Sequence, residues 1–351
     1  MTKRTLSYLI IFSIFSCASI FAQEKIKIKN ITKEFIFNIK PTNNCHAATL
    51  EEVSTDTIMA AWFGGTYEGA KDVGIYLSKF DGEKWSEPYC QINPIIQNKD
   101  TLPCWNPVLF KSQSQCLYLF YKIGENPREW FGAMITSQDN GKTWSKTKYL
   151  PKNILGPIRN KPIEISPGII ICGSSTESTV DNKWRVHLEI FNEENRTWKK
   201  VKVKNTSAFD VIQPTFITHP NQKIQMLCRS KHNTVISSWS LNGGESWSDL
   251  DSIPVVNSNS GIDALTINDS LFLLVNNPLK QGTNWFNGRN VLDVEYSKNG
   301  IIWNKLIDLE NQEKGEFSYP AIIQTSNQKI HILYTYNREF IKHISFNISP
   351  D

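Results

Sequence analysis

The sequence predicts an all-β protein, a six-bladed β-propeller whose blades are four-stranded antiparallel sheets. Three observations support this prediction: one short segment shape occurs six times, a tight turn that leads into a tryptophan occurs five times, and helical periodicity is absent. Repeated units at such a spacing are typical of propellers, in which no single blade can bury its apolar faces alone. We therefore expect all six blades to belong to one domain.

Residues 1–22 have the layout of a secretory signal peptide. Basic residues near the start precede an apolar run from Leu6 to Phe21, and Ala22 is a suitable last residue before cleavage. We expect an exported, periplasmic protein in which residues 23–351 form the propeller domain. The alternative is a lipoprotein anchored through Cys17, and in either case the apolar run is too short for a membrane span.

The composition is that of an ordinary globular protein, with 40% hydrophobic and 21% charged residues. A formal charge of +4 from scattered basic residues gives no reason to expect nucleic acid as a partner, although it is compatible with small anionic substrates. The eleven Trp and eleven Tyr suit carbohydrate binding as well as packing. Nothing in the composition requires a second subunit, and we expect a monomer.

Six cysteines remain after the signal segment, and Cys116, Cys172 and Cys228 lie in apolar, strand-like runs. A free cysteine in such a run behaves as a small hydrophobic residue. No cysteines or histidines have the spacing of a metal site, so we expect neither a metal nor another cofactor. The sequence leaves open whether the cysteines form disulfides.

The chain begins, after the signal segment, with a strand and then repeats one unit. From about Glu24 to Lys40 apolar and polar residues alternate, which is strand periodicity. The unit that follows consists of a first strand, a turn, a second strand, an irregular loop, a third strand, a tight turn and a tryptophan. We expect the second strands at residues 57–62, 116–121, 168–173, 224–228, 270–275 and 329–335.

The first strand of each unit begins with the segment that occurs six times, for example the stretch from Phe317 to Ile323. In every copy a polar side chain precedes Pro or Ala, and a short strand-like run follows. Because the inner strands of a propeller run along its central channel, residues at their starts are expected to meet at one mouth. The side chains at this position are His46, Asn106, Lys161, Gln213, Asp263 and Tyr319.

The tight turns follow the pattern S-x-D-x-G-x-T-W, which is complete from Ser137 to Trp144 and closely varied from Ser240 to Trp247. Asp or Asn bonds its own backbone, Gly supplies a positive φ, and Trp packs the hairpin against its neighbour. For the sixth blade we expect the amino-terminal strand to pair with residues 341–346 and close the ring. The five tryptophans, 49 to 59 residues apart, are Trp85, Trp144, Trp198, Trp247 and Trp303.

These turns match the Asp-box, or bacterial neuraminidase repeat, so the chain resembles the sialidase-like superfamily of six-bladed propellers from roughly Cys45 to His343. The resemblance implies a site in which three arginines hold a substrate carboxylate, a tyrosine paired with a glutamate is the nucleophile, and an aspartate is the acid. Tyr319 matches the place of the tyrosine, and Arg229 and Arg289 are candidates for two of the arginines. The fold alone does not fix the reaction.

The chain departs from that pattern at two positions. His46 stands where the resemblance implies an arginine in the first blade, and Gln213 is neutral near the place of the glutamate. Glu68 or Asp72 stands where the acid loop lies. The remaining polar groups therefore fit a different reaction better than hydrolysis of a sialic acid.

A second set of candidates comes from the ends of the second strands and from residues close by in sequence. Together with the first set they supply cations, imidazole, phenol and amides, which suit an anionic sugar. Trp62 and Trp105 are candidate sugar platforms, although core packing accounts for them equally well. The other members are Lys122, Glu177, Arg229, Arg289, Arg338, Glu68 and Asp72.

We predict that the protein acts on the terminal uronate of an acidic oligosaccharide by β-elimination, as a lyase or a dehydratase in polysaccharide degradation. Elimination needs a base for the C5 proton and also cations and amides that stabilise an enolate-like intermediate. His46 and Tyr319 are the candidates for proton transfer. Lys161 and Arg229 would neutralise the carboxylate, together with the amides of Asn106 and Gln213.

Other interpretations of the same residues stay open. Asp263 or Glu177 could pair with the cations for structural reasons, since a buried cation needs an anionic partner. Two other functions are a sialidase-type exo-glycosidase and a carbohydrate-binding propeller that does not catalyse.

Overall fold

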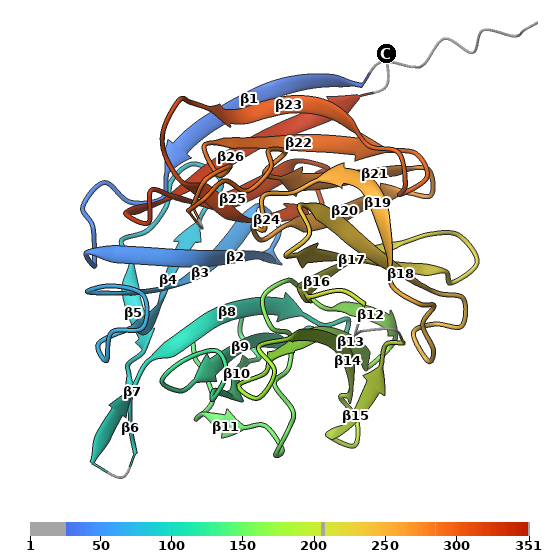
Figure 1. Ribbon diagram of the computed structural model, residues 1–351. Coiled ribbons are helices and arrows are strands. Elements are labelled where there is room, and N and C mark those ends of the chain that lie inside the picture. The colour runs from blue at the N-terminus through green and yellow to red at the C-terminus, as the bar shows by residue number, and fades with distance from the viewer. Residues whose placement is uncertain (1–25, 98, 205–207, 285, 350–351) are drawn as a thin grey trace, which may run out of the picture.

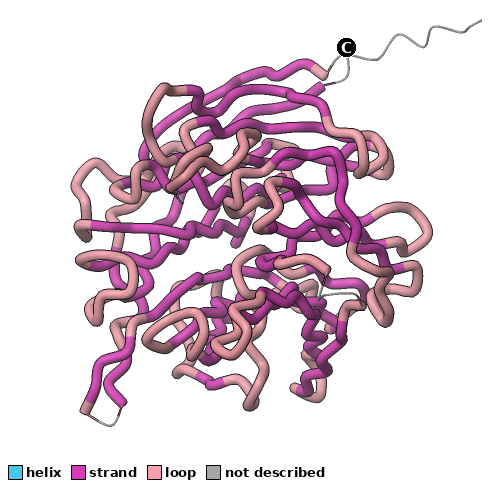
Figure 2. Tube along the Cα trace, viewed as in Figure 1, coloured by secondary structure: helices cyan, strands magenta, loops and turns pink. Residues whose placement is uncertain are grey.

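The computed structural model describes residues 26–97, 99–204, 208–284 and 286–349, and within these ranges every regular element is a strand (Figure 2). The predicted signal segment 1–22 and Cys17 lie outside the described residues. Six four-stranded antiparallel sheets, which we call blades 1 to 6, form a ring, so the predicted six-bladed β-propeller is confirmed (Figure 1). The described part of the chain contains no helix that could cross a membrane.

Blades 1 to 3 follow the chain from the innermost strand outwards. Blade 1 consists of β2 (Asn44–Ser54), β3 (Thr57–Gly65), β4 (Gly74–Phe80) and β5 (Tyr89–Ile92). Blade 2 consists of β8 (Cys104–Lys111), β9 (Leu117–Ile123), β10 (Phe131–Ser137) and β11 (Lys148–Tyr149). Blade 3 consists of β12 (Ile163–Ser166), β13 (Ile169–Glu177), β14 (Trp184–Asn192) and β15 (Thr197–Lys202). A two-stranded ribbon, β6 (Ile95–Gln97) and β7 (Asp100–Leu102), projects between blades 1 and 2 (Figure 1).

Blades 4 to 6 repeat this order and complete the ring. Blade 4 consists of β16 (Val211–Thr218), β17 (Ile224–Ser230), β18 (Thr234–Ser240) and β19 (Asp251–Val256). Blade 5 consists of β20 (Asp263–Asn268), β21 (Leu271–Asn276), β22 (Val291–Ser297) and β23 (Asn304–Asn311). Blade 6 consists of β24 (Phe317–Gln324), β25 (Ile330–Tyr336), β26 (Phe340–Ser349) and the amino-terminal β1 (Lys27–Phe35).

The two ends of the chain close the ring in blade 6. β1 pairs antiparallel with β26, from Lys27 opposite Ser349 to Phe35 opposite Lys342, as predicted (Figure 1). His343 of β26 also contacts Glu34 of β1, with Nδ1 and Oε1 2.9 Å apart. The closure gives the outermost strand of the last blade a hydrogen-bonded neighbour from the other end of the chain.

The core lies between neighbouring blades. Strand β3 alternates its side chains between two such layers: Phe63 packs toward blade 2 with Tyr121, whereas Trp62 packs toward blade 6 with Leu333. The Asp-box turn of blade 2 closes as expected, since Asp139 accepts hydrogen bonds from the backbone N–H and the hydroxyl of Thr143, at 2.8 and 2.6 Å. The glycine of this turn, Gly141, faces Met59 of β3, so the turn packs against the neighbouring blade.

The cysteines in these layers are free thiols. All six, Cys45, Cys90, Cys104, Cys116, Cys172 and Cys228, are without a disulfide partner, and five of them are buried. Burial raises the pKa of the Cys104 thiol to about 12. These cysteines therefore act as packing groups in the sheets.

Four inner strands carry a β-bulge near their start. In blades 2, 4 and 6 the bulge removes Asn106, Gln213 and Tyr319 from the ladder, together with the proline that follows each of them, and their φ angles are 39°, 56° and 54°. Proline suits the second of the two bulge positions, because it has no backbone N–H that would be left without a ladder partner. The bulge turns the side chain before the proline away from its regular ladder direction. In this way three blades present a polar group near the start of the inner strand.

In blade 1 the predicted position is wrong by one residue. The bulge lies between His46 and Thr49, and the residue with positive φ (54°) is Ala47, whereas His46 stays in the ladder opposite Phe63. The sequence Ala47-Ala48 lacks the proline that marks the other bulges. His46 therefore reaches the centre of the propeller from a neighbouring ladder position.

The carboxylate of Asp263 joins four blades around the channel. Its Oδ2 accepts hydrogen bonds from Lys161 Nζ before blade 3, at 2.8 Å, and from the Ile322 N–H in blade 6, at 2.9 Å. Its Oδ1 accepts one from the Thr215 hydroxyl in blade 4, at 2.7 Å. The side chain of Asp263 is 2% exposed, and a buried charge with this set of partners is a structural tie.

Removing this tie should destabilise the propeller strongly. We expect Asp263→Ala to lower the free energy of unfolding by about 3 kcal/mol or more, because it leaves the Lys161 ammonium without its anionic partner. Urea unfolding followed by tryptophan fluorescence measures the loss. Asp269→Ala, in the exposed turn after β20, is the matched control and should change stability little. Equal effects of the two variants would show that Asp263 is not a tie.

Candidate active site

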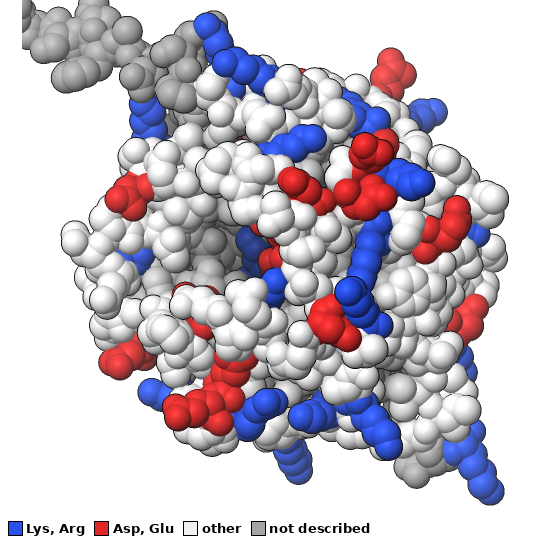
Figure 3. All heavy atoms as spheres, turned by 180° about the vertical axis from the view of Figure 1, so that it is seen from behind, with Lys and Arg blue, Asp and Glu red and all other residues white. Residues whose placement is uncertain are grey.

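The side chains around the channel mouth come from the bulges and from the loops after the second strands. The bulges of blades 4 and 6 supply Gln213 and Tyr319, and Arg229, Arg289 and Arg338 come from the second strands or the loops after them. Seen from the side opposite to Figure 1, the molecule is hollowed near its centre, and basic and acidic side chains line the wall of the hollow (Figure 3). Within the described ranges, no group of His, Cys, Asp or Glu has the arrangement of a metal site.

Tyr319 lies at the centre of these groups. Its hydroxyl accepts a hydrogen bond from Arg229 Nη1 at 2.7 Å, and Gln213 Nε2 lies 3.4 Å from it. Arg229 Nη1 also contacts Gln213 Oε1 at 3.3 Å. Burial disfavours ionisation of the phenol, but the positive charges of Arg229 and Arg289 outweigh it, so the pKa of Tyr319 lies below its ordinary value. The phenolate of Tyr319 therefore forms at a lower pH than that of an ordinary tyrosine.

The ring of Tyr319 packs against the imidazole of His46 and the guanidinium of Arg159. The His46 ring lies on it with a centroid distance of 4.1 Å, and the Arg159 guanidinium carbon lies 5.2 Å from the ring centroid. Tyr319 holds a positive φ of 54°, which is rare for an aromatic residue. A bulky side chain keeps such a conformation only where its surroundings hold it, and strained residues of this kind concentrate at functional sites.

His46 is neutral in this setting. Burial, followed by the positive charges of Arg338, Arg289 and other arginines, lowers the pKa of His46 well below its ordinary value. Nδ1 lies 2.9 Å from the Thr335 hydroxyl, which also receives a hydrogen bond from the Ala47 amide at 3.3 Å. Nε2 is buried and has no hydrogen-bond partner among the described residues. The imidazole therefore supports Tyr319 without adding another charge.

Sequence reasoning missed Arg159. This arginine is 3% exposed, its Nη1 donates to Asn160 Oδ1, and its Nε and Nη2 have no hydrogen-bond partner within the described parts of the chain. Burial lowers the pKa of the guanidinium to about 10, which leaves it positively charged at neutral pH. Arg159 lies two residues before Lys161, and residues 158–160 form a bend, so strand alternation does not relate the two side chains. Nearness in sequence to the repeated position was the available signal.

The other arginines form a chain with two glutamates. Glu316 Oε1 lies 3.1 Å from Arg289 Nη1, and Glu316 Oε2 lies 2.8 Å from Arg338 Nε. Arg338 also forms an ion pair with Glu68 in the loop after β3. Arg338 is thus balanced by two carboxylates, which raise the pKa of its guanidinium despite burial. Its charge is already satisfied by the protein.

Arg229 has a different set of partners. Its Nε donates to Asn259 Oδ1 at 2.8 Å, and its other contacts are the Tyr319 hydroxyl and the Gln213 amide. Among the residues that the structure describes, neither Arg229 nor Arg159 forms an ion pair with a carboxylate. The site therefore has an excess of positive charge beside Tyr319, and an anionic ligand would balance it.

Two predicted cations have structural partners. Lys161 is paired with Asp263 and also donates to the Ala264 carbonyl at 2.8 Å, which is the structural alternative considered from the sequence. Lys122 is fully buried and donates to the Pro157 carbonyl. Burial lowers the pKa of Lys122 to about 7. The structure places the Lys122 side chain in the interior, and its contact with substrate stays a prediction.

The two candidate tryptophans belong to the core. Trp62 is fully buried and stacks on Phe37 with a centroid distance of 5.5 Å. Trp105 is 5% exposed and donates its indole N–H to the Gly124 carbonyl at 2.7 Å. The contacts of both are those of the core-packing alternative, and their role as sugar platforms stays a prediction. Alternation along a strand buries every second side chain, and for these two the core explanation holds.

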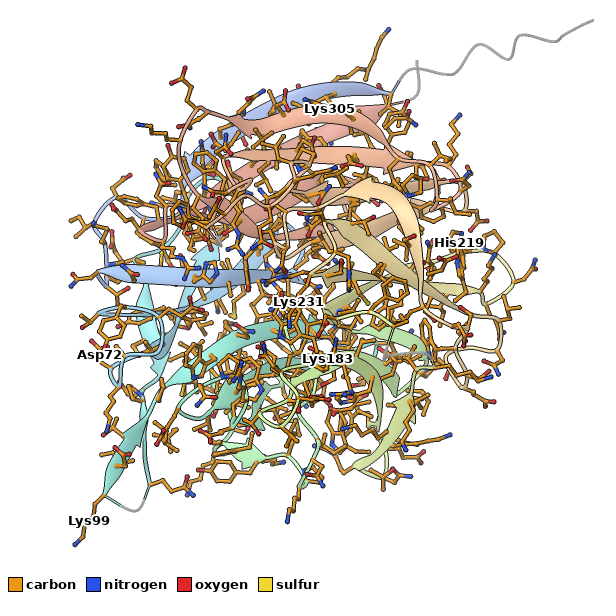
Figure 4. All side chains as sticks on the ribbon, in the orientation of Figure 1. Asp72, Lys99, Lys183, His219, Lys231 and Lys305 are labelled. Carbon is orange, nitrogen blue, oxygen red and sulfur yellow. The ribbon has the colours of Figure 1, made fainter. Side chains whose placement is uncertain are left out.

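The remaining candidates have hydrogen-bond partners within the protein. Asn106 donates to the Ile158 carbonyl at 3.2 Å and so fixes the chain just before Arg159. Glu177 accepts a hydrogen bond from the Trp184 indole at 3.1 Å. Asp72 is exposed at the edge of the molecule and bonds the hydroxyl and backbone N–H of Thr66 in its own loop (Figure 4). Asp72 is thus occupied in closing a loop.

Residues 56–332 match the family described as BNR repeat-like domain. Among solved structures, the NanB sialidase from Streptococcus pneumoniae is similar with a TM-score of 0.68 and 14% identity, over 90% of this chain and 70% of that one. A protein of unknown function from Dyadobacter fermentans has a TM-score of 0.73 and 15% identity, over 93% and 100% of the two chains. The intramolecular trans-sialidase from Ruminococcus gnavus has a TM-score of 0.69 and 13% identity, over 90% and 96%. No curated protein matches the chain, and identities this low show a common fold only.

Replacing Arg229 by methionine should raise the pKa of Tyr319. The change removes the positive charge that contacts the hydroxyl, while burial continues to favour the neutral phenol. The phenolate would then form at higher pH than in the unaltered protein. A pH titration of phenolate absorbance, taken as the difference between each protein and its Tyr319→Phe counterpart, measures this.

Arg185→Met is the matched control for that titration. Arg185 pairs with the carboxylate of Asp181 at the surface, so its removal should leave the Tyr319 titration where it was. An unchanged pKa of Tyr319 in Arg229→Met would contradict the assigned electrostatics of the site.

Proposed function

The chain belongs to the BNR repeat-like domain family of sialidase-like propellers, and on this premise we propose that it is a carbohydrate-active enzyme that binds the carboxylate of an acidic saccharide. One observation supports this proposal above all: a partly buried tyrosine hydroxyl bonded to an arginine that has no carboxylate partner among the described residues. A substrate carboxylate supplies the missing negative charge. The guanidinium fork of Arg229 suits a carboxylate, because both groups are planar and can form two parallel hydrogen bonds.

The reaction that best fits these groups is β-elimination on a uronate. Tyr319, as the phenolate, takes the proton from C5, and the electron pair of that C–H bond forms the C4–C5 double bond. The C4–O bond breaks, and the leaving oxygen takes the proton back from the Tyr319 hydroxyl. Arg229 and Arg289 stabilise the charge that builds up on the carboxylate during proton removal.

His46 is assigned a positioning role in this proposal. Its neutral ring packs on Tyr319, and its Nε2 faces no acceptor among the described residues. A positively charged imidazolium at this place would be repelled by the neighbouring arginines, Arg229 among them. The leaving group at C4 is a sugar in a lyase and hydroxide in a dehydratase.

A sialidase-type exo-glycosidase is the second candidate, since the lowered pKa of Tyr319 would also suit a nucleophile. This function needs a protonated acid at the site. Glu68 forms an ion pair with Arg338, and hydrogen bonds from Thr66 lower the pKa of Asp72. Gln213 cannot accept a proton as a glutamate would. These three features favour elimination over hydrolysis.

The products of uronate oligosaccharides and sialosides test the proposal. Elimination yields an unsaturated uronate with ultraviolet absorbance, hydrolysis yields a reducing sugar or free sialic acid, and a lectin yields neither. We expect the absorbing product from a uronate substrate. Tyr319→Phe should lower its rate at least about a hundredfold, because the variant lacks the group that moves the proton.

The His46→Ala variant distinguishes proton transfer, assigned to Tyr319, from positioning, assigned to His46. As a positioning residue, His46 should affect turnover less than Tyr319 does, and the pH profile should keep its shape. Near-normal turnover in Tyr319→Phe would refute the assigned base, and release of sialic acid would select the second candidate.

Arg229→Ala should weaken the binding of uronate ligands far more than that of their methyl esters. The ester keeps the size of the group and removes its charge, so only the acid loses a charge-assisted hydrogen bond. Calorimetry on matched acid and ester pairs measures the difference, for which we expect about tenfold or more. Equal losses for the two ligands would rule out a carboxylate contact.

A further inference from the structure

Two lysines at the edge of the site share one carboxylate. Lys183, in the loop between β13 and β14, has its Nζ 3.2 Å from Asp210 Oδ2, and Lys231, directly after β17, has its Nζ 3.3 Å from Asp210 Oδ1. The two lysines lie close together near the centre of the view in Figure 4. One carboxylate balances one ammonium, so the pair carries an uncompensated positive charge.

Trp184 connects this pair to the candidate active site. Lys231 Nζ lies 4.5 Å from the indole centroid, and the Arg229 guanidinium carbon lies 5.2 Å from it. The Trp184 backbone N–H donates to Asp210 Oδ1 at 2.9 Å, and its indole N–H donates to Glu177. The arginine of the site and the lysine at the edge therefore lie over the same indole ring. This closeness suits two neighbouring units of one saccharide chain.

The lysines are held in place but remain accessible. The Asp210 side chain is 12% exposed, whereas those of Lys183 and Lys231 are 48% and 32% exposed. Lys231 also donates to the Asn182 carbonyl at 3.1 Å, and Arg128 from blade 2 donates to the side chain of Asn182 at 2.8 Å. An ordered cation pair that stays open to solvent is arranged to receive a ligand.

The charges around Trp184 leave an excess on the positive side. Lys183, Lys231 and Arg229 face the carboxylates of Asp210 and Glu177, and Arg185 is already paired with Asp181. If the lysines served only to neutralise Asp210, one of them would be enough. The second ammonium is better explained by an external anion.

We propose that Lys183 and Lys231 form a second anion-binding subsite, which takes a carboxylate or a sulfate ester on the saccharide unit next to the one held by Arg229. This inference rests on the proposed function and narrows its substrate class to oligosaccharides with anionic groups on neighbouring units. The subsite contributes to affinity and to the choice of substrate. Proton transfer stays with Tyr319.

The test is calorimetry on the Tyr319→Phe protein, in which turnover is suppressed. The probes are a di-uronate, its analogue with the carboxyl of the second unit reduced to an alcohol, and an analogue with a sulfate ester there. We expect the two dianionic ligands to bind about tenfold more tightly than the reduced analogue. The ratio between carboxylate and sulfate identifies the natural group.

Lys183→Gln and Lys231→Gln, added to the same protein, should each reduce that preference several-fold and leave the affinity for the reduced analogue nearly unchanged. Lys305→Gln is the matched control, because Lys305 is also paired with an aspartate but lies on the outer strand of blade 5, far from the pair in Figure 4. Thermal unfolding of each variant checks that the fold is intact. The control should keep the full preference.

Two results would overturn the inference. If the reduced analogue binds as tightly as the dianionic ligands, the second subsite is wrong while the site around Arg229 stands. If none of the acidic ligands binds, the proposed function fails and this inference fails with it.

Discussion

The arrangement of the channel depends on one buried negative charge, that of Asp263. A carboxylate in this position is stable only when every lone pair has a donor, and the donors come from residues of blades 4, 5 and 6 and from Lys161 before blade 3. The inner strands are thereby fixed in relation to each other at the level where the bulges begin. A rigid ring of this kind can hold Tyr319 in a positive-φ conformation that an isolated strand would abandon.

The same ring decides which cations are available to a ligand. Lys161 forms an ion pair with Asp263, and Arg338 forms ion pairs with Glu316 and Glu68. Arg229 keeps only neutral partners among the described residues, and it is the group that contacts the Tyr319 hydroxyl. Lys161 and Arg338 are thus paired with carboxylates, whereas Arg229 is not. The positive charge of Arg229 lowers the pKa of Tyr319.

Much of the fold could be predicted from the sequence, because strands and turns repeat with a period that local chemistry makes visible. In three blades the repeated position, Asn106, Gln213 and Tyr319, is the residue that begins a bulge, and the proline after it fits there. Blade 1 has alanine instead, so nothing in the sequence showed that its bulge begins at Ala47. Likewise, the position of a residue at the end of a second strand does not show which side-chain layer it enters, so the burial of Trp62 and Lys122 could not be read from the repeats. The pairing of Lys161 with Asp263 was one alternative in the sequence, and only the structure shows the contact across 102 positions of the chain.

The balance of positive and negative charge also differs between the two sides of the mouth. On the side of blades 6 and 1, the two arginines Arg289 and Arg338 are balanced by the two carboxylates of Glu316 and Glu68. On the side of blades 3 and 4, Arg159, Arg229 and the lysines on Asp210 leave positive charge unbalanced by the described residues. Under the proposed function, the anionic units of an acidic oligosaccharide would be drawn toward the positive side, over blades 3 and 4. Tyr319 stands between the two sides, and the proposed reaction at a terminal unit is consistent with that position.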